Sequence, residues 1–309
     1  MDWHLLIAQL LNGLQLGLLL FLLAAGLSLI FGIMDFINLS HGAFYMLGAF
    51  ICAGVASVTG SLLAAALAAV TAVFVVGAVV EWLVVRKLYA KDHLDHVLVT
   101  YGLILVFDSV ARMIWGSAGV AIALPEALNG RIEFAGIVIP AYRLLLIVCG
   151  LLAAAGLYGL VTRSRLGMLI RAGASNRVMV TALGVNIGRL YRIVFAIGAA
   201  LAGLAGLLIA PLTEAHIGMG NEIIITAFVV VIVGGIGSVK GAFYAALLIG
   251  FIDTLGRAYL DDILKLFLST AAAETAAPAL SAMSVYILMA AVLACKPQGL
   301  FAPAGRRSR

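Results

Sequence analysis

Five polar or small residues stand within eight positions, between two long apolar runs: Asp35, Asn38, Ser40, His41 and Gly42. Apolar segments rarely contain such groups, because each unpaired polar group costs several kcal/mol in hydrocarbon. Two interpretations are open for this polar turn (residues 35–42). Its side chains line a route for a solute, beside a helix amino terminus that attracts an anionic group. Alternatively, it is an ordinary cytoplasmic turn. In both, Ser40 caps the next helix and Asp35 reaches the membrane interface.

A short stretch of this turn recurs late in the chain, where His41-Gly-Ala-Phe-Tyr45 is matched by Lys240-Gly-Ala-Phe-Tyr244. Hydrophobic segments interrupted at matching places in two halves of a sequence indicate a transport route. A four-residue match also arises by chance in so biased a composition. The residues that would line the route are Asn38, Ser40, His41, Gly42, Ser238 and Lys240.

No cluster of residues supports catalysis. The glycine-rich run Gly234–Gly241 lacks the Gly-x4-Gly-Lys-Ser/Thr spacing of a phosphate-binding loop, because Val239 precedes the lysine and Gly241 follows it. The five histidines and three cysteines show no metal-ligand spacing, and the net charge of +5 forms no basic stripe for nucleic acid. We therefore expect no enzyme activity, no bound cofactor or metal, no ATP bound by this chain and no nucleic-acid partner.

The amino-acid composition indicates which kind of secondary structure positions these polar residues. Of 309 residues, 64% are hydrophobic and 11% are charged, which suits lipid rather than water as the main solvent. We predict an all-α, polytopic transmembrane helical bundle of about 8–9 spans, forming a single domain over residues 1–309. The candidate spans are Leu11–Gly32, Ala43–Thr59, Leu62–Val85, Val97–Trp115, Leu144–Thr162, Ile193–Ala210, Ile223–Gly235, Ala242–Gly256 and Pro278–Ala294.

Basic residues predict the orientation of the spans, since short cytoplasmic loops collect lysine and arginine. With the amino terminus outside and nine alternating spans, most of the 19 basic residues fall on the cytoplasmic side, including Arg306, Arg307 and Arg309 at the end of the chain. This predicts an N-out/C-in topology. The basic residues left outside are Arg112, Arg131, Arg143, Arg257 and Lys265.

Ionisable residues inside spans are functional candidates by default. Glu81 stands near a predicted cytoplasmic end, where its carboxylate could reach the interface. Two acids each have an arginine four residues later, one helical turn away, so we expect them to be neutralised locally. These pairs are Asp108 with Arg112, and Asp253 with Arg257.

The longest hydrophilic segment predicted inside covers residues 163–192 and contains six arginines and no acid. Ser175 or Asn176 suits a helix N-cap, and Gly184 suits the position just after a helix end. A helix of about two turns is marginal alone. Positive-inside bias explains the arginines but not apolar side chains facing the cytosol, so we expect another protein to dock on this coupling segment. Those apolar side chains are Val178, Val180 and Leu183.

Three stretches, with matching spacing over most of the chain, carry a resemblance to a known family. They are Asn12-Gly-Leu…Gly26-Leu-Ser-Leu-Ile-Phe-Gly32-Ile-Met-Asp-Phe-Ile-Asn38-Leu-Ser-His41-Gly42, then Gly167-Met-Leu-Ile-Arg171-Ala…Asn176…Ala182-Leu183-Gly184-Val-Asn186, and Val233-Gly-Gly-Ile-Gly-Ser238-Val-Lys-Gly241-Ala. Together they resemble the membrane permeases of branched-chain amino-acid ABC importers, the H-type subunit. The first would be the initial helix with its turn, the second the cytoplasmic coupling segment and the third a late glycine-rich turn.

The resemblance implies a permease that moves branched-chain or related small amino acids and amides inward across a bacterial inner membrane. Its partners would be a second, M-type permease subunit, two cytoplasmic ATPases that bind the ATP, and a periplasmic substrate-binding protein. Many members carry an acid just before the coupling helix, whereas this chain has Gly173-Ala-Ser-Asn176, so an ion pair to the ATPase lacks its acid. The residues implied in ATPase coupling are Arg171, Ala172, Ser175, Asn176, Ala182, Leu183 and Gly184.

An ion-coupled secondary transporter or channel is the alternative, because it too would be an all-helical membrane protein. An integral-membrane enzyme is disfavoured by the missing catalytic cluster. Dependence on ATPases and a binding protein, rather than on an ion gradient, separates the two transporter classes.

Overall fold

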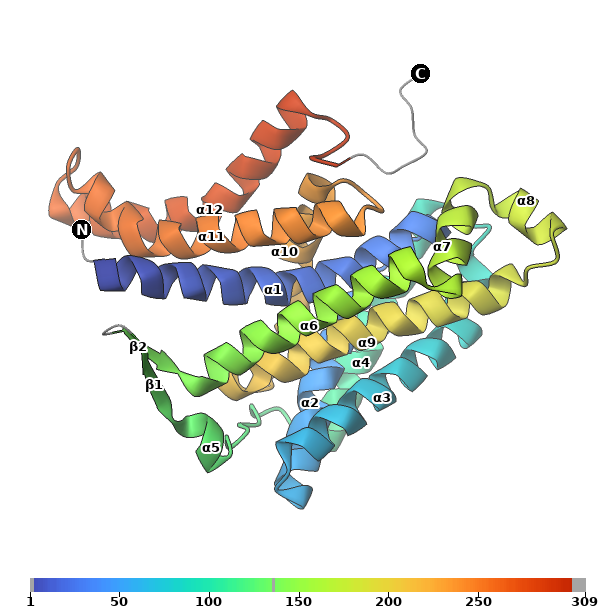
Figure 1. The fold of residues 1–309 in the computed structure, drawn as a ribbon, viewed down its shortest axis with the longest axis horizontal. Coiled ribbons are helices and arrows are strands. Elements are labelled where there is room, and N and C mark those ends of the chain that lie inside the picture. The colour runs from blue at the N-terminus through green and yellow to red at the C-terminus, as the bar shows by residue number, and fades with distance from the viewer. Residues whose placement is uncertain (1–2, 135–136, 302–309) are drawn as a thin grey trace.

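The computed structural model describes residues 3–134 and 137–301, which form an almost entirely helical chain (Figure 1). Three arginines that the predicted topology places on the cytoplasmic side lie outside the described residues. They are Arg306, Arg307 and Arg309. The elements in chain order are α1 Trp3–Met34, α2 His41–Thr59, α3 Leu62–Leu83, η1 Val85–Leu88, α4 His93–Trp115, α5 Glu126–Asn129, β1 Arg131–Phe134, β2 Ile137–Pro140, α6 Ala141–Arg163, α7 Arg165–Ser175, α8 Arg177–Ala182, α9 Ile187–Thr213, α10 Met219–Gly234, α11 Val239–Leu264 and α12 Thr270–Cys295.

The predicted all-α membrane bundle is confirmed. Among the described residues, eight helices are long and apolar enough to cross a membrane, and α10 is a shorter apolar helix of 16 residues. Each of the nine predicted apolar runs coincides with one of these helices, although Leu62–Val85 and Ile223–Gly235 extend past the ends of α3 and α10 at Leu83 and Gly234. The small antiparallel hairpin of β1 and β2, with the short helix α5, was not expected from the sequence.

Helix α1 lies at the centre of the packing, and its residues from Gly17 to Ile30 are all buried. It packs against α9, α10 and α11, while α2 packs against α3 and α9. A glycine at position 17 is required here, because a Cβ would lie 2.9 Å from the Cα atom of Leu247 on α11. Close backbone approach of this kind replaces the hydrophobic effect as the source of helix association in lipid.

Figure 1 shows the two ends of the bundle to be different. Helices α7 and α8 project from one end, and the β1–β2 hairpin with α5 lies towards the other. The predicted coupling segment therefore lies at the opposite end from the hairpin, which contains Arg131, one of the basic residues that the predicted topology leaves outside.

The two predicted one-turn ion pairs have different outcomes. Arg257 Nε lies 2.9 Å from Asp253 Oδ2, which confirms that pair. Asp108 Oδ2 instead accepts a hydrogen bond of 3.5 Å from Asn221 on α10. Among the described side chains, no carboxylate lies within 4.0 Å of the Arg112 guanidinium, so this pair forms no salt bridge, and the positive charge of Arg112 acts on Asp108 only at longer range.

Candidate functional site

The polar turn folds back into the bundle instead of lying at the end of α1. The ring nitrogen Nε2 of His41, the first residue of α2, lies 3.1 Å from the carbonyl oxygen of Leu23. Leu23 precedes the end of α1 at Met34 by eleven residues, or about 16 Å of helix. The six residues from Asp35 to Ser40 can reach that far when extended. Helix α2 therefore begins inside the bundle, and Asp35 is exposed with a φ of 52° where the chain reverses.

Three side chains of the turn, Asn38, Ser40 and His41, are each 0% exposed. Ser40 Oγ donates a hydrogen bond of 2.6 Å to Asn38 Oδ1, and the Leu39 amide donates one of 3.2 Å to Thr100 Oγ1 on α4. Ser40 stands at the N-cap of α2 but makes no capping bond, so the predicted serine cap is wrong: its hydroxyl is held by Asn38. Complete burial distinguishes this segment from an exposed cytoplasmic turn.

Two polar atoms in this buried turn lack a partner. Among the described residues, neither Asn38 Nδ2 nor His41 Nδ1 has a hydrogen-bond partner. A buried donor or acceptor left unpaired costs about 1–3 kcal/mol, and such groups inside a membrane protein usually have a function. The turn thus retains hydrogen-bonding capacity that the fold itself does not use.

The first turns of α2 and α10 touch through their backbones. A Cβ at Gly42 would lie 2.8 Å from the carbonyl carbon of Gly220, the second residue of α10. Only glycine allows this approach from both sides. Because each helix amino terminus carries a partial positive charge, the contact brings two such ends together beside His41.

The other two route candidates, Ser238 and Lys240, lie in a different environment. Ser238 caps α11, its Oγ accepting a hydrogen bond of 3.0 Å from the Gly241 amide. Lys240 is exposed, with Nζ 5.7 Å above the ring of Phe301. The repeated Gly-Ala-Phe-Tyr sequence thus starts a helix in both places, but the structure does not bring Lys240 to the buried turn.

The coupling segment contains the capped mini-helix that the sequence predicts. Helix α8 covers Arg177–Ala182, and Asn176 rather than Ser175 caps it, with Oδ1 accepting a hydrogen bond of 2.9 Å from the Met179 amide. Gly184 follows its end with a φ of 84°. The other residues implied in coupling are Arg171, Ala172 and Ser175 in the last turns of α7, Ala182 at the end of α8, and Leu183 at its C-cap.

Exposure on α8 matches the prediction at two of three positions. Val178 and Leu183 are 75% and 76% exposed, whereas Val180 is buried at 6%. The expectation for Val180 is wrong because that side of the short helix packs back onto α7 and α9.

Helix α7 connects this mini-helix to the bundle. The Arg171 guanidinium donates a hydrogen bond to the Val161 carbonyl at the end of α6. Gly173 lies against the end of α1, where a Cβ would be 3.1 Å from Ile33 Cδ1. The exposed apolar surface of α8 is therefore two helices away from the polar turn, with α7 and the end of α1 between them.

A buried ion pair joins α3 to α9, and the sequence did not predict it. Glu81 is 0% exposed rather than at the interface, and its Oε2 lies 2.9 Å from Arg192 Nε. The Tyr89 hydroxyl donates a hydrogen bond to the other oxygen. Burial, followed by the bond to Glu81, raises the pKa of Tyr89, so this phenol remains a donor. No local signal links positions 81 and 192.

These features define a class, the polytopic helical membrane protein with polar groups buried within its bundle. Residues 9–293 match the family described as branched-chain amino acid transport system / permease component, and the chain belongs to this family.

Two bacterial relatives support this membership. The chain is 32% identical over 272 residues to the high-affinity branched-chain amino acid transport system permease protein BraD of Pseudomonas aeruginosa, covering 83% of this chain and 88% of that protein. It is 29% identical over 274 residues to the corresponding permease protein LivH of Escherichia coli, with the same coverage.

An archaeal relative is more distant. The probable branched-chain amino acid transport permease protein LivH of Methanocaldococcus jannaschii is 25% identical over 255 residues, covering 78% of each chain. No solved structure matches the chain significantly.

Proposed function

We propose that this chain is the membrane-spanning permease subunit of a binding-protein-dependent ABC importer for branched-chain or related small amino acids and amides. The family match over residues 9–293, together with the relatives' names, supports this function. The chain would act as a single domain in the plasma (inner) membrane, with its amino terminus outside and its carboxyl terminus inside. It would bind no ATP or other cofactor itself.

The translocation route would pass the polar turn. The observation that supports this place best is the pair of fully buried, unpartnered atoms, Asn38 Nδ2 and His41 Nδ1, at the start of α2. Gly42 adds the convergence of two helix amino termini, the arrangement by which interrupted helices hold anionic substrate groups in other transporters. Ser238 and Lys240 would lie at the cytoplasmic mouth of the route.

ATP-driven movement would enter through the coupling segment. The exposed side chains of Val178 and Leu183 would seat in a groove of a cytoplasmic ATPase, which binds the ATP. Displacement of α8 would move α7, and α7 bears on Ile33 through Gly173. Since Ile33 precedes the polar turn by two residues, the same movement would switch the turn between two arrangements.

The proposed complex has four further components: a second permease of the M-type, two ATPases and a periplasmic binding protein. Its decisive test is uptake of labelled leucine into vesicles that contain the whole complex. We expect uptake to require internal ATP and the binding protein, and to persist after all ion gradients are collapsed. Uptake that continues without ATP and follows an ion gradient would show a secondary transporter instead.

The coupling contact can be tested separately with Leu183→Asp. A charge at this exposed position should abolish association with the ATPases, because the groove would have to desolvate it. Val58→Asp is the matched control, since Val58 is 85% exposed at the far end of α2 and should leave association intact. ATPase binding that survives Leu183→Asp unchanged would show that α8 is not the contact.

The route can be tested by labelling Asn38→Cys in a Cys295→Ser background, which removes an exposed thiol. We expect a small maleimide to react slowly in the resting complex and faster when ATP or substrate shifts the turn. Reactivity that is the same in every state would mean that the turn is a static structural element.

A further inference from the structure

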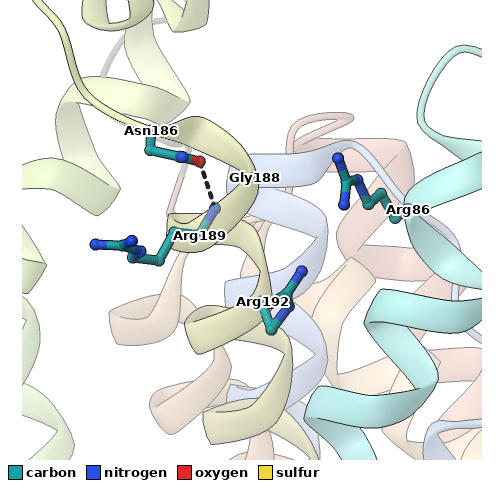
Figure 2. Close-up of a pocket in the computed structure, with 5 residues that line it drawn as sticks. All are labelled: Arg86, Asn186, Gly188, Arg189 and Arg192. Atoms are coloured by element: carbon teal, nitrogen blue, oxygen red, sulfur yellow. Dashed lines mark hydrogen bonds between the residues drawn. The ribbon is translucent and has the colours of Figure 1, made fainter.

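A cavity of about 200 Å³ lies between η1 and the first turns of α9, and none of its lining residues belongs to the polar turn. In Figure 2, Arg86 lies on one ribbon and the other lining residues lie at the start of α9 or just before it. Its lining residues are Arg86, Asn186, Gly188, Arg189 and Arg192.

The positive charge of this arginine cavity exceeds its negative charge. Arg192 is paired through Nε with Glu81, which leaves its terminal guanidinium nitrogens free of that acid. Within the described part of the chain, no carboxylate lies within 4.0 Å of Arg86 or Arg189. The two arginines whose side chains face the cavity, Arg86 and Arg192, stand against the single acid Glu81, which leaves one uncompensated positive charge for an anion to pair with.

The guanidinium groups are not equivalent. In Figure 2, Arg86 and Arg192 extend into the space between η1 and α9, whereas the side chain of Arg189 points to the other side of α9. Arg86 and Arg192 therefore form the two arms of the cavity. Two planar guanidinium forks facing one space suit the tetrahedral oxygens of a phosphate, which arginine binds in a bidentate manner.

The start of α9 adds to this field. Asn186 Oδ1 accepts a hydrogen bond of 2.9 Å from the Arg189 amide, which fixes the first turn of a helix of 27 residues. Space in front of Gly188 is open, since the only atom near a Cβ placed there is Asn186 Oδ1 at 3.5 Å. An anion in the cavity can therefore approach the positive end of α9 as well as the two arginines.

The helix end beside the cavity carries residues typical of a membrane interface. Trp82 and Leu83, the last two residues of α3, are 54% and 48% exposed, and Arg86 follows them within one turn. Exposed tryptophan at the end of a membrane span is typical of the interface between lipid and water. We propose that the arginine cavity binds the phosphate headgroup of an anionic membrane phospholipid, as basic pockets between spans can do.

A protein partner fits this place less well. The surface of the coupling segment that suits a protein is apolar, at Val178 and Leu183, whereas the cavity is walled by arginines and borders an exposed apolar helix end. An acyl chain can lie along the exposed side of α3 at Val79 and Trp82 while its phosphate occupies the cavity. In this proposal the arginine cavity receives the phosphate and the exposed end of α3 receives an acyl chain.

The test compares three forms of the full chain, purified in detergent: wild type, Arg86→Gln and Lys87→Gln. Lys87 is the matched control, because it is the exposed neighbour of Arg86, carries the same charge and does not line the cavity. Retention of added phosphatidylglycerol or cardiolipin is measured by native mass spectrometry, with phosphatidylcholine as the neutral lipid. Thermal unfolding checks that all three chains are folded.

We expect the wild type and Lys87→Gln to retain the anionic lipids in preference to phosphatidylcholine, and Arg86→Gln to bind them about fivefold more weakly. Equal loss in both variants would overturn the proposal, since it would show diffuse surface charge. Displacement of the lipid by inorganic phosphate at a similar concentration would also overturn it, by identifying a small-anion site. So would lipid retention by Arg86→Gln equal to that of the wild type, since the arginine would then contribute nothing to binding the headgroup.

Discussion

Glu81 and Arg192 form an ion pair of 2.9 Å between α3 and α9, and the two partners are buried to different extents: the Glu81 side chain is 0% exposed and that of Arg192 is 38% exposed. Removal of either partner breaks the same hydrogen bond. The consequences differ, because a carboxylate without its arginine stays buried, whereas an arginine without its carboxylate still reaches solvent.

We therefore expect Arg192→Gln to destabilise the chain by about 3–5 kcal/mol and Glu81→Gln by only about 1 kcal/mol. The double variant should be closer to Glu81→Gln than to Arg192→Gln, since it leaves no buried charge. The measurement is the free energy of unfolding of each purified chain in mixed micelles. Equal losses from the two single changes would contradict the asymmetric burial.

The contact of Gly42 with Gly220 allows a second prediction. An alanine at either position places its Cβ against backbone of the other helix, which cannot rotate away. Gly42→Ala and Gly220→Ala should each lose about 1–3 kcal/mol of stability and shift the start of α2. Melting temperature and leucine uptake by the complex are the readouts.

Gly102→Ala, within α4, is the matched control, because no atom of another element lies within 4 Å of its Cβ position. We expect it to be neutral or slightly stabilising, as alanine is the better helix former by about 1 kcal/mol. If Gly102→Ala were as harmful as Gly42→Ala, close packing would not be the reason for either effect.

The cap of α8 gives a third prediction. Asn176→Ala removes the acceptor for the Met179 amide and should weaken this short helix by about 1 kcal/mol, seen as faster hydrogen exchange of its amides and weaker stimulation of the ATPases. Asn176→Asp keeps a capping oxygen and should preserve the helix. Because it also introduces the acid that the family resemblance implies just before this helix, it should maintain or strengthen ATPase binding.

Orientation can be checked with two single-cysteine chains in a background lacking Cys295. Glu126 and Val178 are exposed, at opposite ends of the bundle. With an N-out/C-in topology, Glu126→Cys should react with an impermeant maleimide on intact cells, and Val178→Cys only after permeabilisation. The reverse pattern would mean that the bundle is inserted the other way.

The features that sequence predicts well are those with local causes. An apolar run of sufficient length forms an apolar helix wherever it lies, and all nine predicted runs did so, eight of them within helices long enough to cross a membrane. The short helix α8 was predicted between Asn176 and Gly184 because both residues act on the backbone within a few positions of themselves. Ser40 makes no capping bond to α2 although its local sequence context is equally good, and its hydroxyl instead donates a hydrogen bond to Asn38.

The sequence by itself determined the membrane class, the family, the positions of the helices and the capped helix on the coupling segment, because hydrophobic length and capping chemistry act over a few residues. Only the tertiary structure decided that His41 lies beside Leu23 inside the bundle, that Glu81 is paired with Arg192, and that Arg86 and Arg192 share one cavity. The physical reason is that the burial and charge state of a polar group depend on which distant helices pack around it, and that is a property of the assembled bundle.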